Sequence, residues 1–206
     1  MLEGDPVAVA PRLLGAVLHG RGVSVRLTEV EAYGGVGVDP GSHAFRGRTP
    51  RTEPMFGPAG TVYVYLSYGM HHCLNLVCGP AGIAGGVLLR AGEVVAGAEL
   101  AGQRRAAAAP RRSGSCASRV IAHRDLARGP ARLASALAIE LTDSGGMLGA
   151  SLVTLDLGAP QPPELIAAGP RVGVSGRGGT DEFPWRFWLA GDPTVSVYRP
   201  AVTRTR

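Results

Sequence analysis

Hydrophobic and polar positions change their spacing within the first thirty residues of the chain. Asp5-Pro6 has the residue types of a helix start, because Asp is a good N-cap and Pro suits the first helical position. Apolar residues then recur at helical spacing, at Val7, Ala10, Leu13, Leu14, Val17 and Leu18. Residues 23–33 instead alternate and are rich in β-branched side chains. The pattern predicts a helix that begins at Pro6 and ends at Gly20, followed by a strand over 23–33.

Short strand patterns separated by glycine- and proline-rich turns dominate the rest of the chain. Strands are predicted over 61–66, 73–78 and 85–90, and further short strands with turns fill 152–197. The segment Ser67-Tyr68-Gly69-Met70 separates the first two strands and has a glycine in its turn. Two adjacent strand patterns joined in this way predict a β-hairpin.

Two further helices and two irregular segments complete the chain. Helices are predicted over 94–109 and from Gly129-Pro130 onward. Segment 34–60 is rich in Gly, Pro and Arg and is predicted to be a loop; loops of this length inside a domain are usually functional. Segment 110–118 is predicted to be a flexible basic loop. With no repeat and no convincing linker, the sequence predicts one α+β domain over 1–206, with a mainly antiparallel sheet and flanking helices.

The sequence predicts no membrane-spanning or targeting segment. No apolar run reaches the ~18 residues that a spanning helix needs. The N-terminal apolar stretch carries Glu3, Asp5 and Arg12, and no basic segment precedes it, which is unlike a signal peptide. The three cysteines are an odd number without regular spacing, which argues against a disulfide framework. These features favour an enzyme of the cytoplasm.

The basic residues of this chain are all arginine. The 21 arginines give a formal net charge of +5, and there is no lysine. A basic balance favours a polyanionic partner, and arginine pairs bidentately with phosphate. A GC-rich genome gives the same composition without any such partner. In either case no lysine Schiff base can form, so covalent amine chemistry is restricted to the N-terminal amine.

One face of the strand over 23–33 carries a possible active-site wall. Side chains alternate along a strand, so Glu29, Glu31 and Tyr33 share one face. Two neighbouring carboxylates repel each other, and this repulsion is expected to raise the pKa of one of them. The alternative is a solvated strand face without chemistry.

Four of the five tyrosines lie within a short part of the chain, at Tyr33, Tyr63, Tyr65 and Tyr68. Tyr63 and Tyr65 give the strand over 61–66 one aromatic face, which ordinary β-propensity also explains. Tyr68 is different, because it stands at the hairpin turn with Met70 beside it. Large apolar side chains at a hairpin tip suit a wedge inserted into the DNA minor groove, although a protein-binding tip has the same composition.

Loop 34–60 and the hairpin contain the histidines that invite a catalytic or metal role. His43 lies in a stretch with several arginines, which have phosphate-contacting capacity; a lone loop histidine is more often incidental than catalytic. Four residues with metal-ligating side chains lie close together in the hairpin region, at His71, His72, Cys73 and Cys78. Adjacent strand residues point to opposite faces and no metal-ligand spacing is present, so neither a metal nor another cofactor is predicted.

Several blocks, in order along nearly the whole chain, closely resemble the alkyladenine (3-methyladenine) DNA glycosylase family. They are Thr28-Glu29-Val30-Glu31-Ala32-Tyr33, Arg48-Thr49-Pro50-Arg51, Met55-Phe56, Tyr63-Val64-Tyr65, Tyr68-Gly69-Met70, Asn75, Val87-Leu88-Leu89-Arg90-Ala91, Ala127-Arg128-Gly129-Pro130 with Leu133, Ala136 and Leu137, Arg171-Val172-Gly173-Val174, and Pro184-Trp185-Arg186-Phe187-Trp188. The resemblance implies a single mixed domain with an antiparallel sheet and a protruding β-hairpin.

The resemblance also implies residues for catalysis and for the base pocket. Glu31 resembles the general base that activates the hydrolytic water, and Arg90 resembles the residue that helps hold Glu31 and that water. Tyr33, His43 and Tyr65 resemble the walls that sandwich the flipped base.

Further roles concern the recognition of DNA. Asn75 resembles the pocket residue that discriminates against the 2-amino group of guanine. Tyr68 resembles the wedge that fills the gap left by the flipped nucleotide, with Met70 beside it, and Arg48 and Arg51 are expected to contact DNA. A three-residue turn in the hairpin would put Tyr63, Tyr65 and Asn75 on one face.

These observations predict a monofunctional glycosylase that flips alkylated or deaminated purines from duplex DNA and hydrolyses their N-glycosidic bond with water. The enzyme is predicted to be monofunctional because the chain has no lysine that could form a Schiff base with the sugar. We expect a monomer that acts at the nucleoid in a bacterial cytoplasm. Two alternatives stay open at this point: a damaged-DNA-binding protein without catalysis, and an RNA-binding module.

Overall fold

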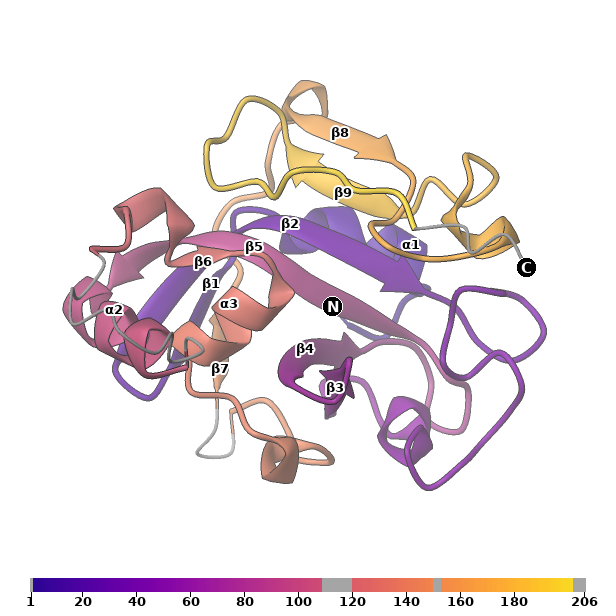
Figure 1. Ribbon diagram of the computed structural model, residues 1–206. Helices are drawn as coiled ribbons and strands as arrows, with labels where there is room; N and C mark the ends of the chain where they lie inside the picture. The colour runs from indigo at the N-terminus through magenta and orange to yellow at the C-terminus, as the bar shows by residue number, and fades with distance from the viewer. Residues whose placement is uncertain (1, 109–119, 150–152, 202–206) are drawn as a thin grey trace.

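A computed structural model describes residues 2–108, 120–149 and 153–201 of the chain (Figure 1). Its strands form one sheet in which every pairing between strands is antiparallel. The strands are β1 (Val17–Gly20), β2 (Val23–Tyr33), β3 (Val62–Ser67), β4 (His71–Val77), β5 (Gly86–Ala96), β6 (Ala127–Arg128), β7 (Thr154–Asp156), β8 (Ile166–Gly169) and β9 (Arg186–Leu189). The predicted α+β class and antiparallel sheet are confirmed.

The helices are short. They are α1 (Pro6–Val9), α2 (Ala98–Ala107) and α3 (Pro130–Ala136), with 3-10 turns η1 (Ala10–Leu13), η2 (Glu53–Phe56), η3 (His123–Asp125), η4 (Leu141–Asp143), η5 (Pro163–Leu165) and η6 (Arg177–Gly179). Figure 1 shows α2 and α3 on one side of the central strands and α1 on the other. Within the described ranges, no helix has the length and apolar character needed to cross a bilayer.

Strands β2 and β5 run side by side through the middle of the sheet, and β2 changes neighbours along its other edge. There β2 pairs with β1 over its first residues and with β9 over 29–31. The β2–β5 register is irregular near the same place, because neither Thr28 nor Arg90 has a residue directly opposite. This irregularity positions the candidate site, since Glu29, Glu31 and Arg90 all lie at or beside it.

The hydrophobic core lies between these strands and the helices that cover them. Packing of α3 against β4 and β5, with α2 against α3, buries an aliphatic cluster. Its fully buried members include Leu18, Leu27, Val30, Leu74, Leu76, Leu89, Leu133 and Leu137. Removing this apolar surface from water is the main stabilising contribution and fixes β2 and β5 rigidly.

The predicted N-terminal helix is correct at its start and wrong in its second half. The Asp5 side chain accepts a hydrogen bond from the Val7 amide, as an N-cap does. Helical structure ends at Leu13, and Gly15 follows with a φ of 82°, which favours glycine. The apolar residues from Val17 onward belong to β1, which returns to β2 through a two-residue turn. Helical spacing failed here because antiparallel pairing buries the same residues.

The other local predictions have mixed outcomes. The hairpin is confirmed, and α3 begins at Pro130 as predicted. Strand β5 continues to Ala96, so the helix predicted over 94–109 begins later, at Ala98, after Gly97 with a φ of 74°. The prediction of a flexible loop over 110–118 lies outside the described residues.

Candidate active site

Two buried carboxylates stand next to each other on β2. The side chains of Glu29 and Glu31 are both 0% exposed, so the alternative of a solvated strand face is wrong. Arg90 on β5 lies between them: its Nε donates to Glu29 Oε1 at 3.0 Å and its Nη1 to Glu31 Oε2 at 3.3 Å. One guanidinium therefore contacts both carboxylates, and the two share one side of β2 as predicted.

Three donors hold Glu31, and two of them come from distant parts of the chain. Besides Arg90, the Tyr33 hydroxyl donates to Glu31 Oε2 at 2.8 Å. The main-chain amide of Val172 donates to Glu31 Oε1 at 2.7 Å. A buried ion is tolerated only when it is paired and hydrogen-bonded, and these three donors meet that requirement.

Glu29 is held even more tightly than Glu31. Burial alone would raise the pKa of this carboxyl, but the charges of Arg90 and Arg186 and the hydrogen bond from Ser196 outweigh burial and lower the pKa. The expectation that like-charge repulsion raises a carboxyl pKa is therefore wrong for Glu29. The reason is that two arginines, one of them on β9, compensate the pair of carboxylates.

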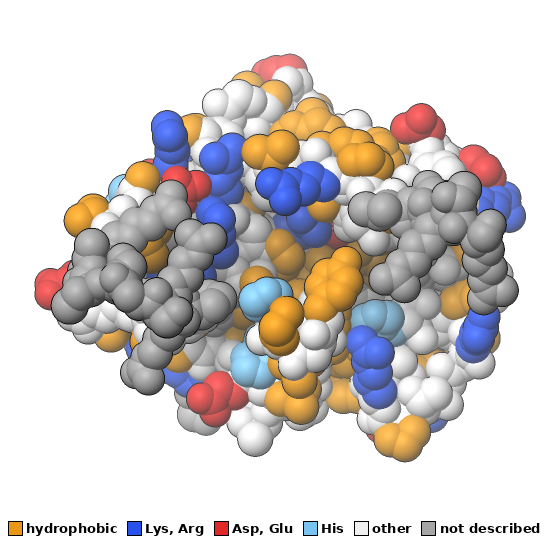
Figure 2. Space-filling model, in the orientation of Figure 1, with side chains coloured by type: hydrophobic (Ala, Val, Ile, Leu, Met, Phe, Trp, Pro, Cys, Tyr) orange, Lys and Arg blue, Asp and Glu red, His pale blue; other side chains and the backbone are white. Residues whose placement is uncertain are grey.

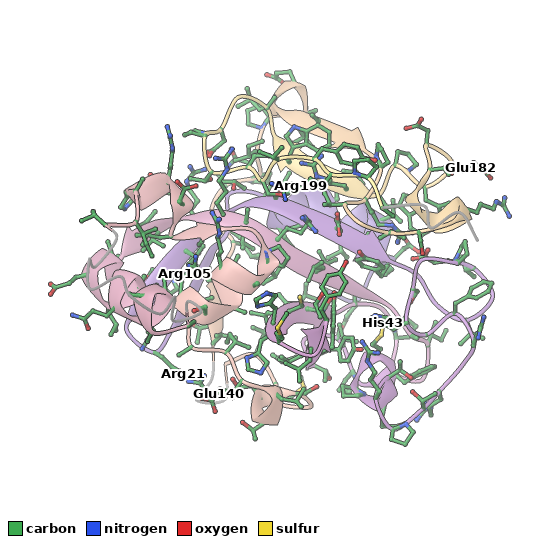
Figure 3. The ribbon with its side chains drawn as sticks, in the orientation of Figure 1. Arg21, His43, Arg105, Glu140, Glu182 and Arg199 are labelled. Carbon is green, nitrogen blue, oxygen red and sulfur yellow. The ribbon has the colours of Figure 1, made fainter. Side chains whose placement is uncertain are left out.

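Aromatic side chains line the space beside Glu31. The Tyr33 ring has the guanidinium of Arg171 over it, with Cζ 4.5 Å from the ring centroid. His43, from loop 34–60, packs edge-on against Tyr65 with ring centroids 4.6 Å apart and hydrogen-bonds Tyr63 Oη through Nδ1 at 3.0 Å. His43 is labelled in Figure 3, close to the β3–β4 hairpin. The loop thus brings His43 to the strand tyrosines, as the predicted pocket requires.

The electrostatic surroundings keep these aromatic groups neutral. Desolvation of the His43 ring, and then the positive charge of Arg51, lower the pKa of His43 to about 4. Burial and the nearby Glu31 raise the pKa of Tyr33 well above its ordinary value. At neutral pH both rings are therefore uncharged and present stacking surfaces.

Asn75 lies on the same hairpin face as Tyr63 and Tyr65. The hairpin closes through three residues, because Ser67 is opposite His71, and Tyr63 is directly opposite Asn75. The prediction that a three-residue turn puts Tyr63, Tyr65 and Asn75 on one face is confirmed. Asn75 is 6% exposed.

The tip of the β3–β4 hairpin carries the most exposed aromatic side chain among the described residues. Tyr68 is 88% exposed and Met70 is 71% exposed, and Tyr68 has a φ of 51°. Figure 2 shows hydrophobic side chains over this hairpin, with histidine and arginine side chains around them. The hydrophobic core does not account for these two residues.

The two arginines predicted to contact DNA differ in their present partners. Arg48 is paired with Glu53 at 2.7 Å and lies over the Phe56 ring. Arg51 makes no ion pair with any described residue; it lies 3.3 Å from His43 Nε2 and over the Tyr65 ring. Arg51 is therefore the freer of the two cations, and it is the one that contacts His43 and Tyr65.

Sequence reasoning missed a second buried ion pair that supports the site. Arg171 binds Asp39 through two contacts of 2.6 Å, and both side chains are 0% exposed. Arg171 also donates to the main-chain oxygens of Ala32 and Gly178. The pair joins loop 34–60 to the segment that carries Val172. The only sequence signal for it was the block Arg171-Val172-Gly173-Val174.

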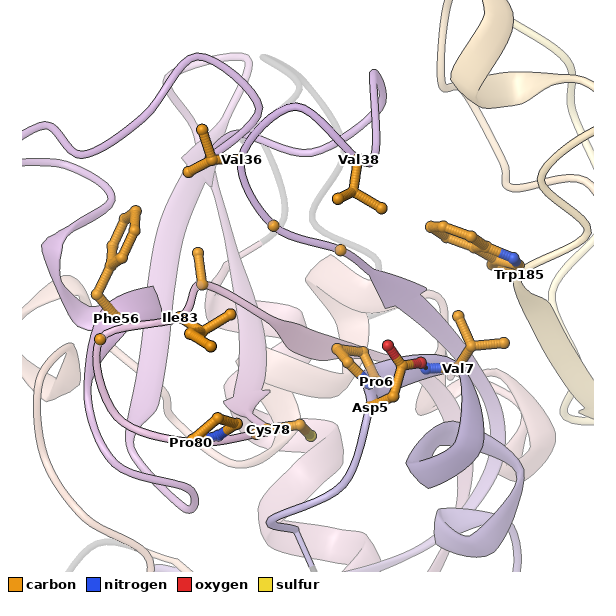
Figure 4. Close-up of a pocket in the computed structure, with 15 residues that line it drawn as sticks. Asp5, Pro6, Val7, Val36, Val38, Phe56, Cys78, Pro80, Ile83 and Trp185 are labelled. Carbon is orange, nitrogen blue, oxygen red and sulfur yellow. Dashed lines mark hydrogen bonds between the residues drawn. The ribbon is translucent and has the colours of Figure 1, made fainter.

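An apolar cavity lies apart from this site, and the described residues hold no metal cluster. The described residues contain no group of three or more His, Cys, Asp and Glu side chains arranged to hold an ion. A cavity of about 590 Å³ lies beyond the end of β2 (Figure 4), between residues that include Pro6, Val38, Ile83 and Trp185. None of the residues predicted to act on a base lines this cavity.

Comparison with known proteins identifies the family to which this chain, with its buried carboxylates and aromatic residues, belongs. The family model described as methylpurine-DNA glycosylase (MPG) matches residues 1–193. The chain belongs to this family. Membership makes the protein a DNA glycosylase of base-excision repair, a hydrolase of N-glycosidic bonds, so the RNA-binding alternative is not supported.

Similar proteins from bacteria carry the provisional name 3-methyladenine DNA glycosylase. One from Leifsonia xyli subsp. xyli is 54% identical over 195 residues, covering 93% of this chain and 87% of the relative. One from Streptomyces avermitilis is 52% identical over 206 residues, covering 96% and 89%. One from Mycobacterium tuberculosis is 44% identical over 207 residues, covering 95% and 90%.

Proposed function

We propose that this methylpurine-DNA glycosylase flips alkylated or deaminated purines out of duplex DNA and releases them with water activated by Glu31. The observation that carries the proposal is the contact between Glu31 and Tyr33. A carboxylate with 0% exposed side chain is hydrogen-bonded at 2.8 Å to the hydroxyl of an aromatic ring. A base stacked on Tyr33 therefore has its sugar linkage close to Glu31.

The aromatic residues provide the binding energy for a flipped base. A base inside a duplex is out of reach of a catalytic side chain, and extrusion costs a few kcal/mol. Stacking on aromatic rings returns about 1–3 kcal/mol per base. Tyr33 supports one face of the base, and His43 with Tyr65 supports the other. A positively charged alkylpurine gains additional cation–π attraction from Tyr65.

Hydrolysis then needs one placed water and one ionised carboxylate. The water oxygen forms a bond to C1′ while the C1′–N bond breaks, and the electron pair of that bond leaves with the purine. Glu31 accepts the proton of the water and stabilises the electron-poor sugar. Arg90 holds Glu31, and the Val172 amide fixes its second oxygen at 2.7 Å.

The remaining residues of the pocket and of the surface select the base and bind the DNA. Asn75 excludes the 2-amino group of normal guanine, and Tyr68 fills the gap in the base stack with Met70 beside it. Arg51 and Arg48 contact phosphates, Arg48 after exchanging Glu53 for a phosphate. The enzyme acts as a monomer on damage in the bacterial nucleoid, since one flipped nucleotide engages one site.

The test is base release from a duplex with a single hypoxanthine, ethenoadenine or 3-methyladenine. Wild type should produce alkali-labile sites, and Glu31→Gln should lower the single-turnover rate by ~10²–10⁴-fold while lesion binding persists. Glu93→Gln is the control, because Glu93 is a half-exposed carboxylate on β5 that pairs with Arg26 instead. Tight lesion binding by both proteins without release would support the non-catalytic alternative.

A second measurement tests the role of water as the nucleophile. The chain contains no lysine, so we expect no covalent adduct when borohydride is added during turnover. A trapped protein–DNA adduct would show amine chemistry and overturn the monofunctional mechanism.

A further inference from the structure

Glu29 is a fully buried ion that the proposed reaction does not use. Its Oε1 accepts from Arg90 Nε at 3.0 Å, Arg186 Nε at 2.6 Å and Ser196 Oγ at 3.0 Å. Its Oε2 accepts from the Ser196 amide at 2.8 Å. The Glu29 side chain is 0% exposed, so water cannot replace these partners.

Arg90 contacts Glu29 and Glu31 at different distances. Arg90 donates one hydrogen bond to each carboxylate, of 3.0 Å to Glu29 and of 3.3 Å to Glu31. Charge-assisted hydrogen bonds of this type usually measure about 2.7–2.9 Å, and arginine–carboxylate pairs are often bidentate. Arg90 therefore approaches Glu31 less closely than an unrestrained arginine would.

We propose that Glu29 is a positioning residue that holds Arg90 by its Nε, so that Arg90 orients Glu31 without forming a tight bidentate pair with it. The inference rests on the proposed function of Glu31. A general base must keep a lone pair available for the proton of water, and Glu31 Oε1 has one, because its described partner is the Val172 amide alone. A bidentate guanidinium would take that lone pair as well. Glu29 competes for the cation and so keeps the second lone pair of Glu31 Oε1 available to water.

The residue type at this position follows from its partners. All four contacts to Glu29 come from donors, on Arg90, Arg186 and Ser196. A glutamine has only one acceptor oxygen, and its NH₂ group would face donors. Arg186 supplies the second positive charge, which keeps the four-group set of Glu29, Glu31, Arg90 and Arg186 balanced at no net charge.

The decisive experiment is a double-mutant cycle on single-turnover base release, with Glu29→Gln, Arg90→Gln and the double variant. We expect Glu29→Gln to slow release by about 10- to 100-fold, a loss typical of small misplacements in an active site, while lesion binding changes less than about threefold. The double variant should be no slower than Arg90→Gln alone, because Glu29 acts through Arg90. Multiplicative losses in the double variant would overturn the proposal.

Matched variants separate positioning from general loss of stability. Asp143→Asn removes another buried carboxylate, which pairs with Arg21 and contacts none of Glu29, Glu31 and Arg90, and it should leave the release rate unchanged at temperatures where it is folded. If Glu29→Gln does not fold, Glu29→Asp keeps the charge but shortens its reach. The rate of Glu29→Asp should then fall while lesion binding holds; an unchanged rate would overturn the proposal.

The outcome is distinguishable from failure of the proposed function. If Glu31→Gln released bases at the wild-type rate, the function assigned to Glu31 would be wrong whatever Glu29 does. If Glu31→Gln is inactive and Glu29→Gln is fully active, only the positioning role of Glu29 is overturned.

Discussion

Asn75 on β4 donates a hydrogen bond from its side-chain amide to the main-chain oxygen of Tyr63, directly opposite on β3, at 3.0 Å. The same Nδ2 lies 3.4 Å from the main-chain oxygen of Cys73. Both N–H groups of the amide are therefore directed at the backbone. The amide cannot swing out of this position without leaving a buried donor unsatisfied, which costs about 1–3 kcal/mol.

This fixed amide leads to a prediction about base selection. Asn75→Ser shortens the side chain, so the 2-amino group of guanine should find room in the pocket. We expect the ratio of guanine to hypoxanthine release to rise by about tenfold, equivalent to about 1.4 kcal/mol of lost discrimination. Competition between the two bases in otherwise identical duplexes measures this ratio. An unchanged ratio would mean that Asn75 has a structural role only.

The exposed hairpin tip leads to a second prediction. Tyr68→Ala should weaken binding to lesion duplex and slow flipping, because the wedge is lost, while the dependence of binding on salt stays the same. Fluorescence of a flipped ethenoadenine, followed over a range of salt concentrations, measures both effects. Tyr68→Gly is the companion variant: with a φ of 51° at this position, glycine should not lower the melting temperature. A changed salt slope would indicate a phosphate contact instead of a wedge.

The third prediction concerns the protonation of His43. The pKa of His43 in the folded protein is lowered to about 4, below the ~6.5 of an unfolded chain. Between these values the unfolded state binds the proton preferentially, so this group lowers folding stability as pH falls from about 6.5 towards 4. Above pH 6.5 it has no such effect. NMR titration of the imidazole, assigned with His43→Gln, should show a neutral ring at pH 6; a midpoint above 6 would contradict this.

Local sequence signals predicted the elements that carry the candidate active site. Alternation located β2 with Glu31 and Tyr33 on one face, and the turn at Gly69 located the hairpin. The register with Asn75 was predicted only for a three-residue turn, which the structure contains. The same kind of signal failed at Val17, since whether an apolar segment forms a helix or a strand depended on pairing with β2. Hydrophobic periodicity alone does not distinguish a helix from a strand in short segments.

The supporting residues of the site were beyond reach of any pattern in the sequence. Val172 contacts Glu31 across 141 residues of chain, and Ser196 contacts Glu29 across 167. Val172 contributes a main-chain amide, and Ser196 contributes its amide together with its hydroxyl. The position of these groups depends on the folded path of the chain. The resemblance indicated the importance of the segment around Arg171, but only the fold revealed Asp39 as its partner.

The last prediction tests that partner. Asp39→Asn leaves Arg171 as an uncompensated buried charge, so the free energy of unfolding should fall by about 3–5 kcal/mol. Replacing both residues, as Asp39→Asn with Arg171→Met, should be less destabilising, because no buried charge remains. Urea denaturation measures both, with Glu182→Gln as control, since its pair with Arg177 is exposed on both sides. A loss below about 1 kcal/mol for Asp39→Asn would mean that the pair does not anchor loop 34–60.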